Sequence, residues 1–208
     1  MADHLVVARS EFILGGQKSG KSRRAELLAR DWLAQSPEHR AVLIATAQPW
    51  DDEMRERITR HQLDRAARVP GMSTVEEPLA LADTVARSST ANTLIVVDCL
   101  TLWLTNLLMP AEALETAEKN GNHLKNESKE AVAGVVQAQQ AMVLGAIKNA
   151  AGPVVLVGNE IGLGVIPLGR ETRAFVDALG RLNQDVAAVC ERVTLMAAGL
   201  PLFLKGQP

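Results

Sequence analysis

The chain has 208 residues, and its 22 basic and 24 acidic side chains leave a formal net charge of −2. Proteins that coat nucleic acid or an anionic membrane carry an excess of basic charge, so the near-neutral balance argues against both. Aromatic residues make up only 3% of the chain, which argues against binding of single strands by base stacking. The length predicts one domain over residues 1–208, large enough to bury a substantial core.

Short apolar runs alternate with longer amphipathic stretches along the chain. Continuous apolar runs of this length are typical of strands buried on both faces of a parallel sheet. In chain order they predict strands over residues 12–14, 41–45, 94–97, 154–157, 193–196 and 202–204. Helical spacing of apolar residues, or an acidic first turn, predicts helices over residues 22–35, 51–65, 132–150 and 172–191. The alternation implies an α/β layer fold, and residues 110–130 are expected to form a loop or a frayed helix.

No uncharged apolar run is long enough to predict a membrane span, because the nearest case, residues 94–108, carries Asp98 in its middle. Cys99 and Cys190 are too few for a disulfide framework or a four-cysteine zinc site. Both lie among apolar residues. We therefore expect two buried thiols and a protein of the reducing cytoplasm.

The strongest local motif lies between the first predicted strand and the first predicted helix. It matches the phosphate-loop pattern G-x-x-x-x-G-K-[ST] in full, with the residues Gly15, Gly16, Gln17, Lys18, Ser19, Gly20, Lys21 and Ser22. Glycines allow backbone N–H groups to turn inward around an anion, and the N-terminus of the following helix favours negative charge. We expect Lys21 to reach the β- and γ-phosphates of a nucleotide and the Ser22 hydroxyl to bind Mg²⁺. The alternative is a glycine-rich turn that matches the pattern by chance.

An acidic residue follows one of the predicted buried strands. Asp98 comes directly after the apolar run 94–97. Burying an unpaired carboxylate is costly, so its presence there requires a partner. We expect Asp98 to hold Mg²⁺ together with Ser22, as the acidic partner of a phosphate loop. The alternative is that Asp98 caps the N-terminus of a following helix.

One histidine stands in an unusually basic setting. Arg57, Arg60, Arg65 and Arg68 surround His61 near the end of the predicted helix 51–65. Arg57 and His61 are four residues apart and therefore share a helix face. A neutral imidazole nitrogen can attack phosphorus, and flanking guanidinium groups can hold an anion. From the residues alone, a solvated surface histidine is the alternative.

Four blocks of sequence now cover most of the chain. They are residues 15–22, residues 44–61 with Asp51-Asp52-Glu53 and Arg57-Ile58-x-x-His61, residues 98–108, and residues 159–167 followed by 180–184. In this order they resemble the adenosylcobinamide kinase / adenosylcobinamide-phosphate guanylyltransferase family of cobalamin biosynthesis. The first block is shared with many NTPases, whereas the other three are more specific to the family.

The resemblance implies an enzyme with two reactions. The first transfers phosphate from ATP or GTP to adenosylcobinamide, and the second transfers GMP from GTP to the product through a GMP–histidine intermediate. The histidine that matches is His61, with Lys21 as the second catalytic residue. The implied fold is P-loop NTPase-like (RecA-like), a mostly parallel sheet flanked by helices in three layers, and the implied assembly is a homo-oligomer, a trimer. Beyond the phosphate loop, the implied nucleotide contacts are Ala45, Thr46, Ala47, Gln62, Leu63, Asp64, Arg65, Glu76 and Asp98.

Three other functions remain open at this point. One is another small-molecule P-loop kinase without guanylyltransferase activity, which would have no use for His61. Another is a nucleotide-dependent binding or regulatory module, and the third is a guanylyltransferase that has lost its kinase activity. Asn159 and Glu160 follow the predicted strand 154–157 and are expected to line the site, with a purely structural capping role as the alternative.

Overall fold

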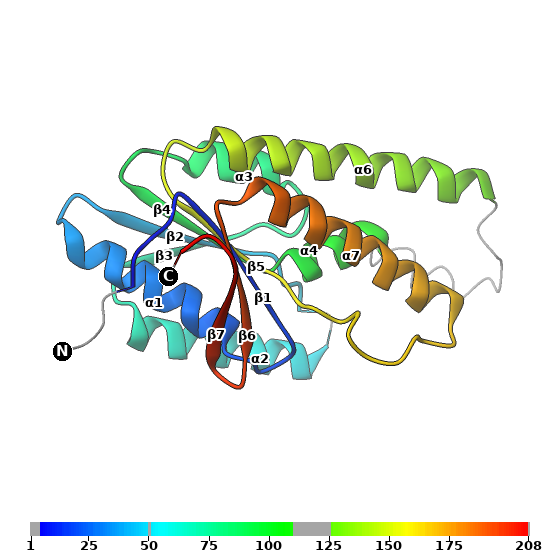
Figure 1. Cartoon of the computed structure of the whole chain (residues 1–208), viewed down its shortest axis with the longest axis horizontal. Coiled ribbons are helices and arrows are strands. Elements are labelled where there is room, and N and C mark those ends of the chain that lie inside the picture. Colours follow the sequence, from blue (N-terminus) through cyan, green and yellow to red (C-terminus); the bar gives the residue numbers. More distant parts are fainter. Residues whose placement is uncertain (1–4, 50, 110–125, 208) are drawn as a thin grey trace.

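The structure, a computed structural model, describes residues 5–49, 51–109 and 126–207, and its centre is one seven-stranded sheet. The strand order is β3-β2-β4-β5-β1-β6-β7, and every pair is parallel except the antiparallel pair β6–β7 (Figure 1). The strands are β1 (Ser10–Gly15), β2 (Arg40–Ala45), β3 (Met72–Glu76), β4 (Thr93–Asp98), β5 (Val154–Val157), β6 (Arg192–Ala197) and β7 (Leu200–Lys205).

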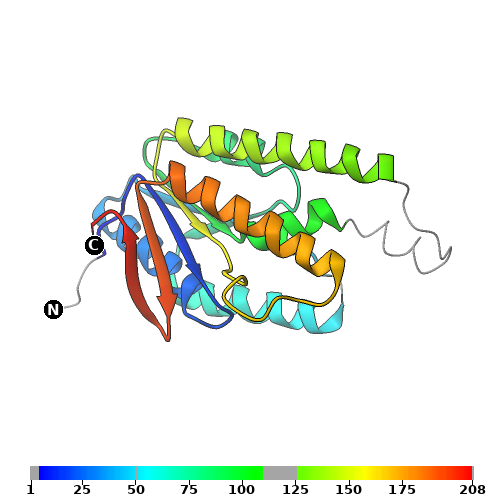
Figure 2. The ribbon, with the colours of Figure 1, turned by 45° about the vertical axis from the view of Figure 1, so that its right-hand side comes forward.

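Helices cover both faces of this sheet. They are α1 (Lys21–Gln35), α2 (Asp52–Arg68), α3 (Leu81–Ser88), α4 (Leu100–Leu108), α6 (Asn126–Asn149) and α7 (Arg170–Val189). Figures 1 and 2 show α3, α4, α6 and α7 on one side of the sheet and α1 and α2 on the other. The predicted P-loop NTPase-like α/β fold, with a mostly parallel sheet in three layers, is confirmed. No helix within the described ranges is long and apolar enough to cross a bilayer.

The apolar runs are continuous because the sheet has a core on each face. Along β5, Val154 and Leu156 belong to the core under α3, α4, α6 and α7, whereas Val155 and Val157 belong to the core under α1. Successive side chains of a strand point to opposite faces, so a strand covered on both sides needs an apolar residue at every position.

All six predicted strands and all four predicted helices are present, with boundaries shifted by a few residues. The acidic start of α2 caps the helix as expected, since Asp51 Oδ1 accepts a hydrogen bond of 2.7 Å from Met54 N. Helix α6 already includes residues 126–130, which fits the helical alternative for that stretch, and residues 110–125 lie outside the described part. Strand β3 and helices α3 and α4 are additional to the prediction.

A buried ionic network joins the sheet to the helix after the phosphate loop. Glu11 on β1 has no exposed surface, and its Oε1 accepts hydrogen bonds from Arg24 Nε (2.9 Å) and Thr194 Oγ1 (2.8 Å). Its Oε2 accepts a third bond of 3.1 Å from Arg192 Nη1. Buried charges are tolerated when each has partners, so this network ties β1, β6 and the first turns of α1 together.

Replacing Glu11 with alanine is expected to lower the free energy of unfolding by about 3–5 kcal/mol, because the buried guanidinium groups of Arg24 and Arg192 lose their counter-charge. Urea unfolding followed by circular dichroism measures the change. The matched control is Arg55→Ala, which breaks the exposed pair with Asp52 and should cost about 0–1 kcal/mol. Equal losses in the two variants would contradict the role given to the network.

Candidate nucleotide-binding site

The phosphate loop connects β1 to α1 and needs glycine at both ends. Gly20 lies just before α1 in the left-handed region, with φ of 101°. A Cβ on Gly15 would lie 2.5 Å from the carbonyl oxygen of Met196 and 2.6 Å from Ser19 Oγ, so no other residue fits there. The Lys21 side chain is buried and folds back across the loop, with Nζ donating a 2.6 Å hydrogen bond to the Gly16 carbonyl. The lysine is therefore already held against the loop.

Segments distant in the sequence support the loop from both sides. The Gly199 amide, in the turn between β6 and β7, donates to the Ser19 carbonyl at 3.0 Å. The Glu160 amide, in the segment after β5, donates to the Gly15 carbonyl at 3.1 Å. The loop conformation therefore depends on the two strands that flank β1 as well as on its own glycines.

The carboxyl ends of the parallel strands meet at the edge that carries the phosphate loop. Asp98 on β4 is in register with Ala45 on β2 and with Val157 on β5, and Val157 pairs with Ile13 on β1. The Asp98 carboxylate is therefore separated from the phosphate-loop strand by β5 alone. Ligands of open α/β sheets bind outside this edge, which is where the motif residues converge.

Asp98 does not cap the following helix, so the capping alternative is wrong. The residue at the N-terminal boundary of α4 is Cys99, and no side chain caps that end. Within the described residues the half-buried Asp98 carboxylate has no hydrogen-bond or ion-pair partner. A carboxylate held at a strand end without a protein partner is available to a ligand.

Lys21 and Asp98 both influence the pKa of the neighbouring Cys99 thiol. The pKa of the buried Cys99 thiol is raised to about 11, first by burial and then by the Asp98 carboxylate. Backbone hydrogen bonds and the Lys21 ammonium oppose this rise. The pKa of Glu26 on α1 is also raised, mainly by burial, against Arg68 and with a smaller contribution from Asp98. The ammonium and the carboxylate thus lie close enough to influence the same group.

The oxygen donors at this edge fit a magnesium ion. Mg²⁺ prefers carboxylate and hydroxyl oxygens and is usually held by one or two carboxylates together with substrate phosphates. Ser22, half-buried in the first turn of α1, and Asp98 supply such donors. No group of three or more metal-binding His, Cys, Asp or Glu side chains occurs among the residues described. The donor set therefore suits an ion that arrives with a nucleotide.

Both cysteines are buried free thiols, as predicted, and we expect them to react slowly with iodoacetamide at pH 8 in the folded protein. The pKa is raised mainly by burial, to about 11 for Cys99 and about 12 for Cys190, and the thiolate is the reactive form. Raising the pKa of Cys99 from 9.0 to about 11 reduces the thiolate fraction at pH 8 about 100-fold. Mass spectrometry should detect alkylation mainly after unfolding in guanidinium, and equal rates in both states would contradict the expectation.

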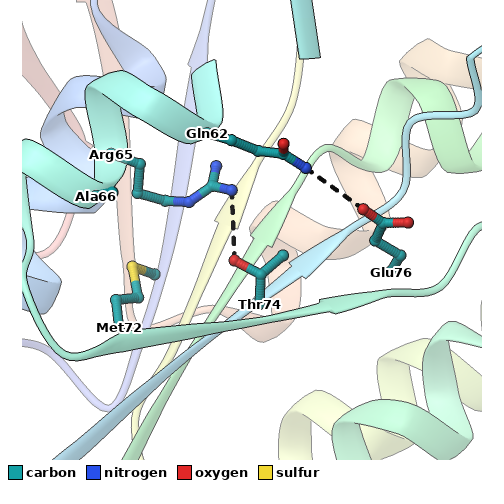
Figure 3. A pocket seen from close by; sticks show the side chains of 6 residues that line it. All are labelled: Gln62, Arg65, Ala66, Met72, Thr74 and Glu76. Carbon is teal, nitrogen blue, oxygen red and sulfur yellow. Dashed lines mark hydrogen bonds between the residues drawn. The ribbon is translucent and has the colours of Figure 1, made fainter. Parts of the chain in front are cut away.

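A second polar pocket opens between α2 and β3. It is a cavity of about 300 Å³ lined by Gln62, Arg65, Ala66, Met72, Thr74 and Glu76 (Figure 3). Gln62 Nε2 donates to Glu76 Oε1 at 3.4 Å, and Arg65 Nη2 donates to Thr74 Oγ1 at 3.3 Å. The lining offers amide and guanidinium donors beside a carboxylate acceptor, so it suits a ligand with both kinds of polar group.

The structure divides the implied nucleotide contacts into two groups. One group is the phosphate loop with Asp98, Ala45 at the end of β2 and the two residues after it, and the other lines the α2–β3 cavity. Leu63 and Asp64 are exposed on α2 and do not line that cavity. His61 is also exposed on α2 and does not line it. Strand β3 lines the cavity, strand β1 leads into the phosphate loop, and three strands lie between them. At a spacing of about 4.8 Å between neighbouring strands, β3 and β1 are about 19 Å apart.

Asn159 and Glu160, which follow β5, make hydrogen bonds within the protein. The Asn159 backbone is fixed, since its amide donates to Thr101 Oγ1 at 2.8 Å and its carbonyl accepts from Asn183 Nδ2 at 3.1 Å. The Glu160 carboxylate accepts from the Gly162 amide at 2.8 Å, a bond within the non-helical segment between β5 and α7. Sequence reasoning gave no roles to Thr101 and Asn183, although both lie in blocks that carry the family resemblance.

The fold and this site define a P-loop nucleotide-binding protein. Residues 11–204 match the family model described as "Cobinamide kinase / cobinamide phosphate guanyltransferase", and the chain belongs to this family. It is accordingly a kinase and nucleotidyltransferase of cobalamin biosynthesis, as the resemblance implied.

Curated relatives cover almost the whole chain. "Bifunctional adenosylcobalamin biosynthesis protein CobP" of Pseudomonas aeruginosa is 43% identical over 95% of this chain and 98% of its own length. "Bifunctional adenosylcobalamin biosynthesis protein CobU" of Escherichia coli and of Salmonella typhimurium are each 32% identical, over 93% of this chain and 98% of their own. A solved structure, "flagellar accessory protein FlaH from Methanocaldococcus jannaschii", aligns over 97% of this chain and 80% of its own, with a TM-score of 0.49 and 10% identity.

Proposed function

We propose that the protein phosphorylates the aminopropanol hydroxyl of adenosylcobinamide with ATP or GTP and then transfers GMP from GTP to the resulting phosphate. The product is adenosylcobinamide-GDP, and the GMP passes through a phosphoramidate on His61. The observation that carries the proposal is membership of the cobinamide kinase / guanyltransferase family over residues 11–204. The role of His61 follows from the Arg57-Ile58-x-x-His61 pattern, in which the sequence resembles this family.

In the kinase reaction, the phosphate loop binds the triphosphate and Lys21 neutralises charge that develops between the β- and γ-phosphates. Ser22 and Asp98 would hold Mg²⁺, which supplies further charge neutralisation at the phosphates. The substrate hydroxyl oxygen forms a bond to the γ-phosphorus while the bond to the β–γ bridging oxygen breaks. The hydroxyl proton is released, and the nucleoside diphosphate leaves.

In the guanylyl reaction, a neutral ring nitrogen of His61 forms a bond to the α-phosphorus of GTP, and pyrophosphate leaves. A phosphate oxygen of adenosylcobinamide phosphate then attacks the same phosphorus, and the imidazole leaves. Gln62, Arg65 and Glu76 line a cavity with donors and an acceptor that suit the edge of a guanine base, and Gln62 directly follows His61 in α2. We assign the guanine to this cavity.

His61 must approach the α-phosphate, and the packing of α2 supports such an approach. No side chain described for α2 is buried, whereas α1 and α7 each contribute buried residues to a core. Arg68 at the end of α2 pairs with Glu26 of α1, and the side-chain hydrogen bonds that Gln62 and Arg65 donate to β3 are exposed. A helix with few buried contacts requires little free energy to shift.

The protein incubated with Mg²⁺ and α-³²P-labelled GTP is expected to carry label that survives alkali and is lost in acid, as a phosphoramidate does. A second incubation with γ-³²P-labelled ATP or GTP and adenosylcobinamide should label the corrinoid. A plain P-loop kinase would give the second result without the first. A guanylyltransferase without kinase activity would give the first without the second.

We further propose that both reactions take place within one domain, in the cytoplasm, and that the chain assembles as a homotrimer. Free, buried thiols support a reducing compartment. Support for assembly comes from exposed apolar side chains in the segment between β5 and α7, where Leu163, Val165 and Leu168 are 82%, 96% and 97% exposed. Apolar groups gathered on a surface are typical of contact with a partner.

A further inference from the structure

We propose that Thr46 and Asn106 are positioning residues that hold the Asp98 end of β4 in place for the nucleotide-bound metal ion. The inference rests on the proposed role of Asp98 as a metal ligand. It changes the role of Thr46, which the family resemblance places among the nucleotide contacts.

Thr46 is fully buried, and all of its polar groups bond within the protein. Its hydroxyl donates to the Cys99 carbonyl at 2.7 Å and accepts from the Cys99 amide at 2.9 Å. Its amide donates to the Asp98 carbonyl at 3.2 Å. The Thr46 side chain is therefore turned towards the backbone around Asp98, and none of these groups is left for a nucleotide.

Asn106 holds Thr46 through the Thr46 carbonyl. It lies on α4 with 2% of its surface exposed, and its Nδ2 donates to the Thr46 carbonyl at 2.8 Å. The same Nδ2 donates to the Pro78 carbonyl at 3.1 Å, two residues beyond Glu76 at the end of β3. One buried amide thus joins the segments that follow β2 and β3, and through Thr46 it reaches β4.

The chain of bonds fixes the direction in which the Asp98 carboxylate leaves the sheet. Thr46 makes three hydrogen bonds to this part of the backbone: two to Cys99, the residue directly after β4, and one to Asp98 itself. Residues that hold a metal ligand from behind usually contribute 10–100-fold to metal affinity or activity, because they fix the orientation of the ligand. Loss of the Thr46 hydroxyl should therefore weaken metal binding while the phosphate loop is unchanged.

The test measures GDP binding by isothermal titration calorimetry at a series of Mg²⁺ concentrations and in EDTA. Thr46→Val removes the hydroxyl and keeps the shape, and we expect the Mg²⁺ concentration for half-maximal GDP binding to rise about tenfold or more. GDP affinity in EDTA should stay close to that of the unmodified protein. Thr46→Ser keeps the hydroxyl and should restore the original Mg²⁺ dependence, which a purely structural role would not require.

Asp98→Asn separates this inference from the proposed function. If Asp98→Asn leaves the Mg²⁺ dependence unchanged, Asp98 is not a metal ligand, and the part of the proposed function that assigns Mg²⁺ binding to Asp98 is overturned. If Asp98→Asn raises the Mg²⁺ requirement and Thr46→Val does not, the positioning role is overturned. It is also overturned if Thr46→Val weakens GDP binding equally in EDTA.

Asn106→Leu provides an independent variant of the same network. It removes the donor to Thr46 and Pro78 and is expected to raise the Mg²⁺ requirement in the same direction. If Thr46→Val does not fold, as judged by circular dichroism, Asn106→Leu decides the question by the same two measurements. An unchanged Mg²⁺ requirement in folded Asn106→Leu would overturn its part in the proposal.

Discussion

The His61→Ala variant is expected to lose GMP transfer, by about 1,000-fold or more, and to keep the phosphorylation of adenosylcobinamide. Removing a covalent nucleophile eliminates the step that depends on it, and losses of this size are typical of such variants. The kinase reaction does not use the imidazole, so adenosylcobinamide phosphate should accumulate. Chromatography of the corrinoid products, together with protein-bound label from α-³²P-labelled GTP, measures the two reactions separately.

The matched control for this variant is another histidine of the same chain. His39 stacks on Trp32 with ring centroids 3.7 Å apart, and its Nδ1 lies 2.8 Å from the Trp32 carbonyl oxygen, away from the phosphate loop. His39→Gln should retain the labelled adduct. An adduct that persists in His61→Ala would show that another residue carries the GMP.

The Lys21→Met variant is expected to lose the phosphorylation of adenosylcobinamide by a comparable factor. The ammonium lies against the loop that we propose binds the triphosphate, and no other described residue of this loop combines its charge with burial. Methionine keeps a similar length without the charge, so the loop retains its bulk. Transfer of label from γ-³²P-labelled ATP to the corrinoid measures the rate.

Arg23→Met is the control for Lys21→Met, because Arg23 lies in the same first turn of α1 but is exposed. It should change the rate little, and both variants should melt close to the unmodified protein. Full phosphorylation by Lys21→Met would contradict the role given to the lysine. If Lys21→Met also forms less of the His61 adduct, the same loop holds the pyrophosphate that leaves in the guanylyl reaction. An unchanged adduct would place that pyrophosphate elsewhere.

The sheet could be predicted from the sequence wherever a strand is covered on both faces. The runs 94–97 and 154–157 are continuous because every one of their residues belongs to one of the two cores, and in the run 41–45 only Val42 does not. Strand β3 was missed because it lies at the edge of the sheet, and its sequence Met72–Glu76 is largely exposed and polar. As a result, only the family resemblance indicated Glu76, although its register with Ala45 places it at the same sheet edge as Asp98.

The phosphate loop could also be predicted, since its eight residues are contiguous and the backbone conformation depends on their glycines. The buried polar residues behind the site could not. Thr46 bonds to Cys99, 53 residues away, and Asn106 bonds to Thr46, 60 residues away. A partner at such a distance follows from strand order and register, which no local pattern contains. The Glu11 network has the same origin, because Arg192 is 181 residues from Glu11.

The hairpin of β6 and β7 affects where the chain can be shortened. None of the four motif blocks extends beyond residue 184, yet the Gly199 amide bonds to Ser19 and the Met196 carbonyl lies against Gly15. Arg24, in the helix after the loop, lies over the Phe203 ring at 5.3 Å. A chain that stops before β6 would therefore keep all four motif blocks and lose one wall of the phosphate loop.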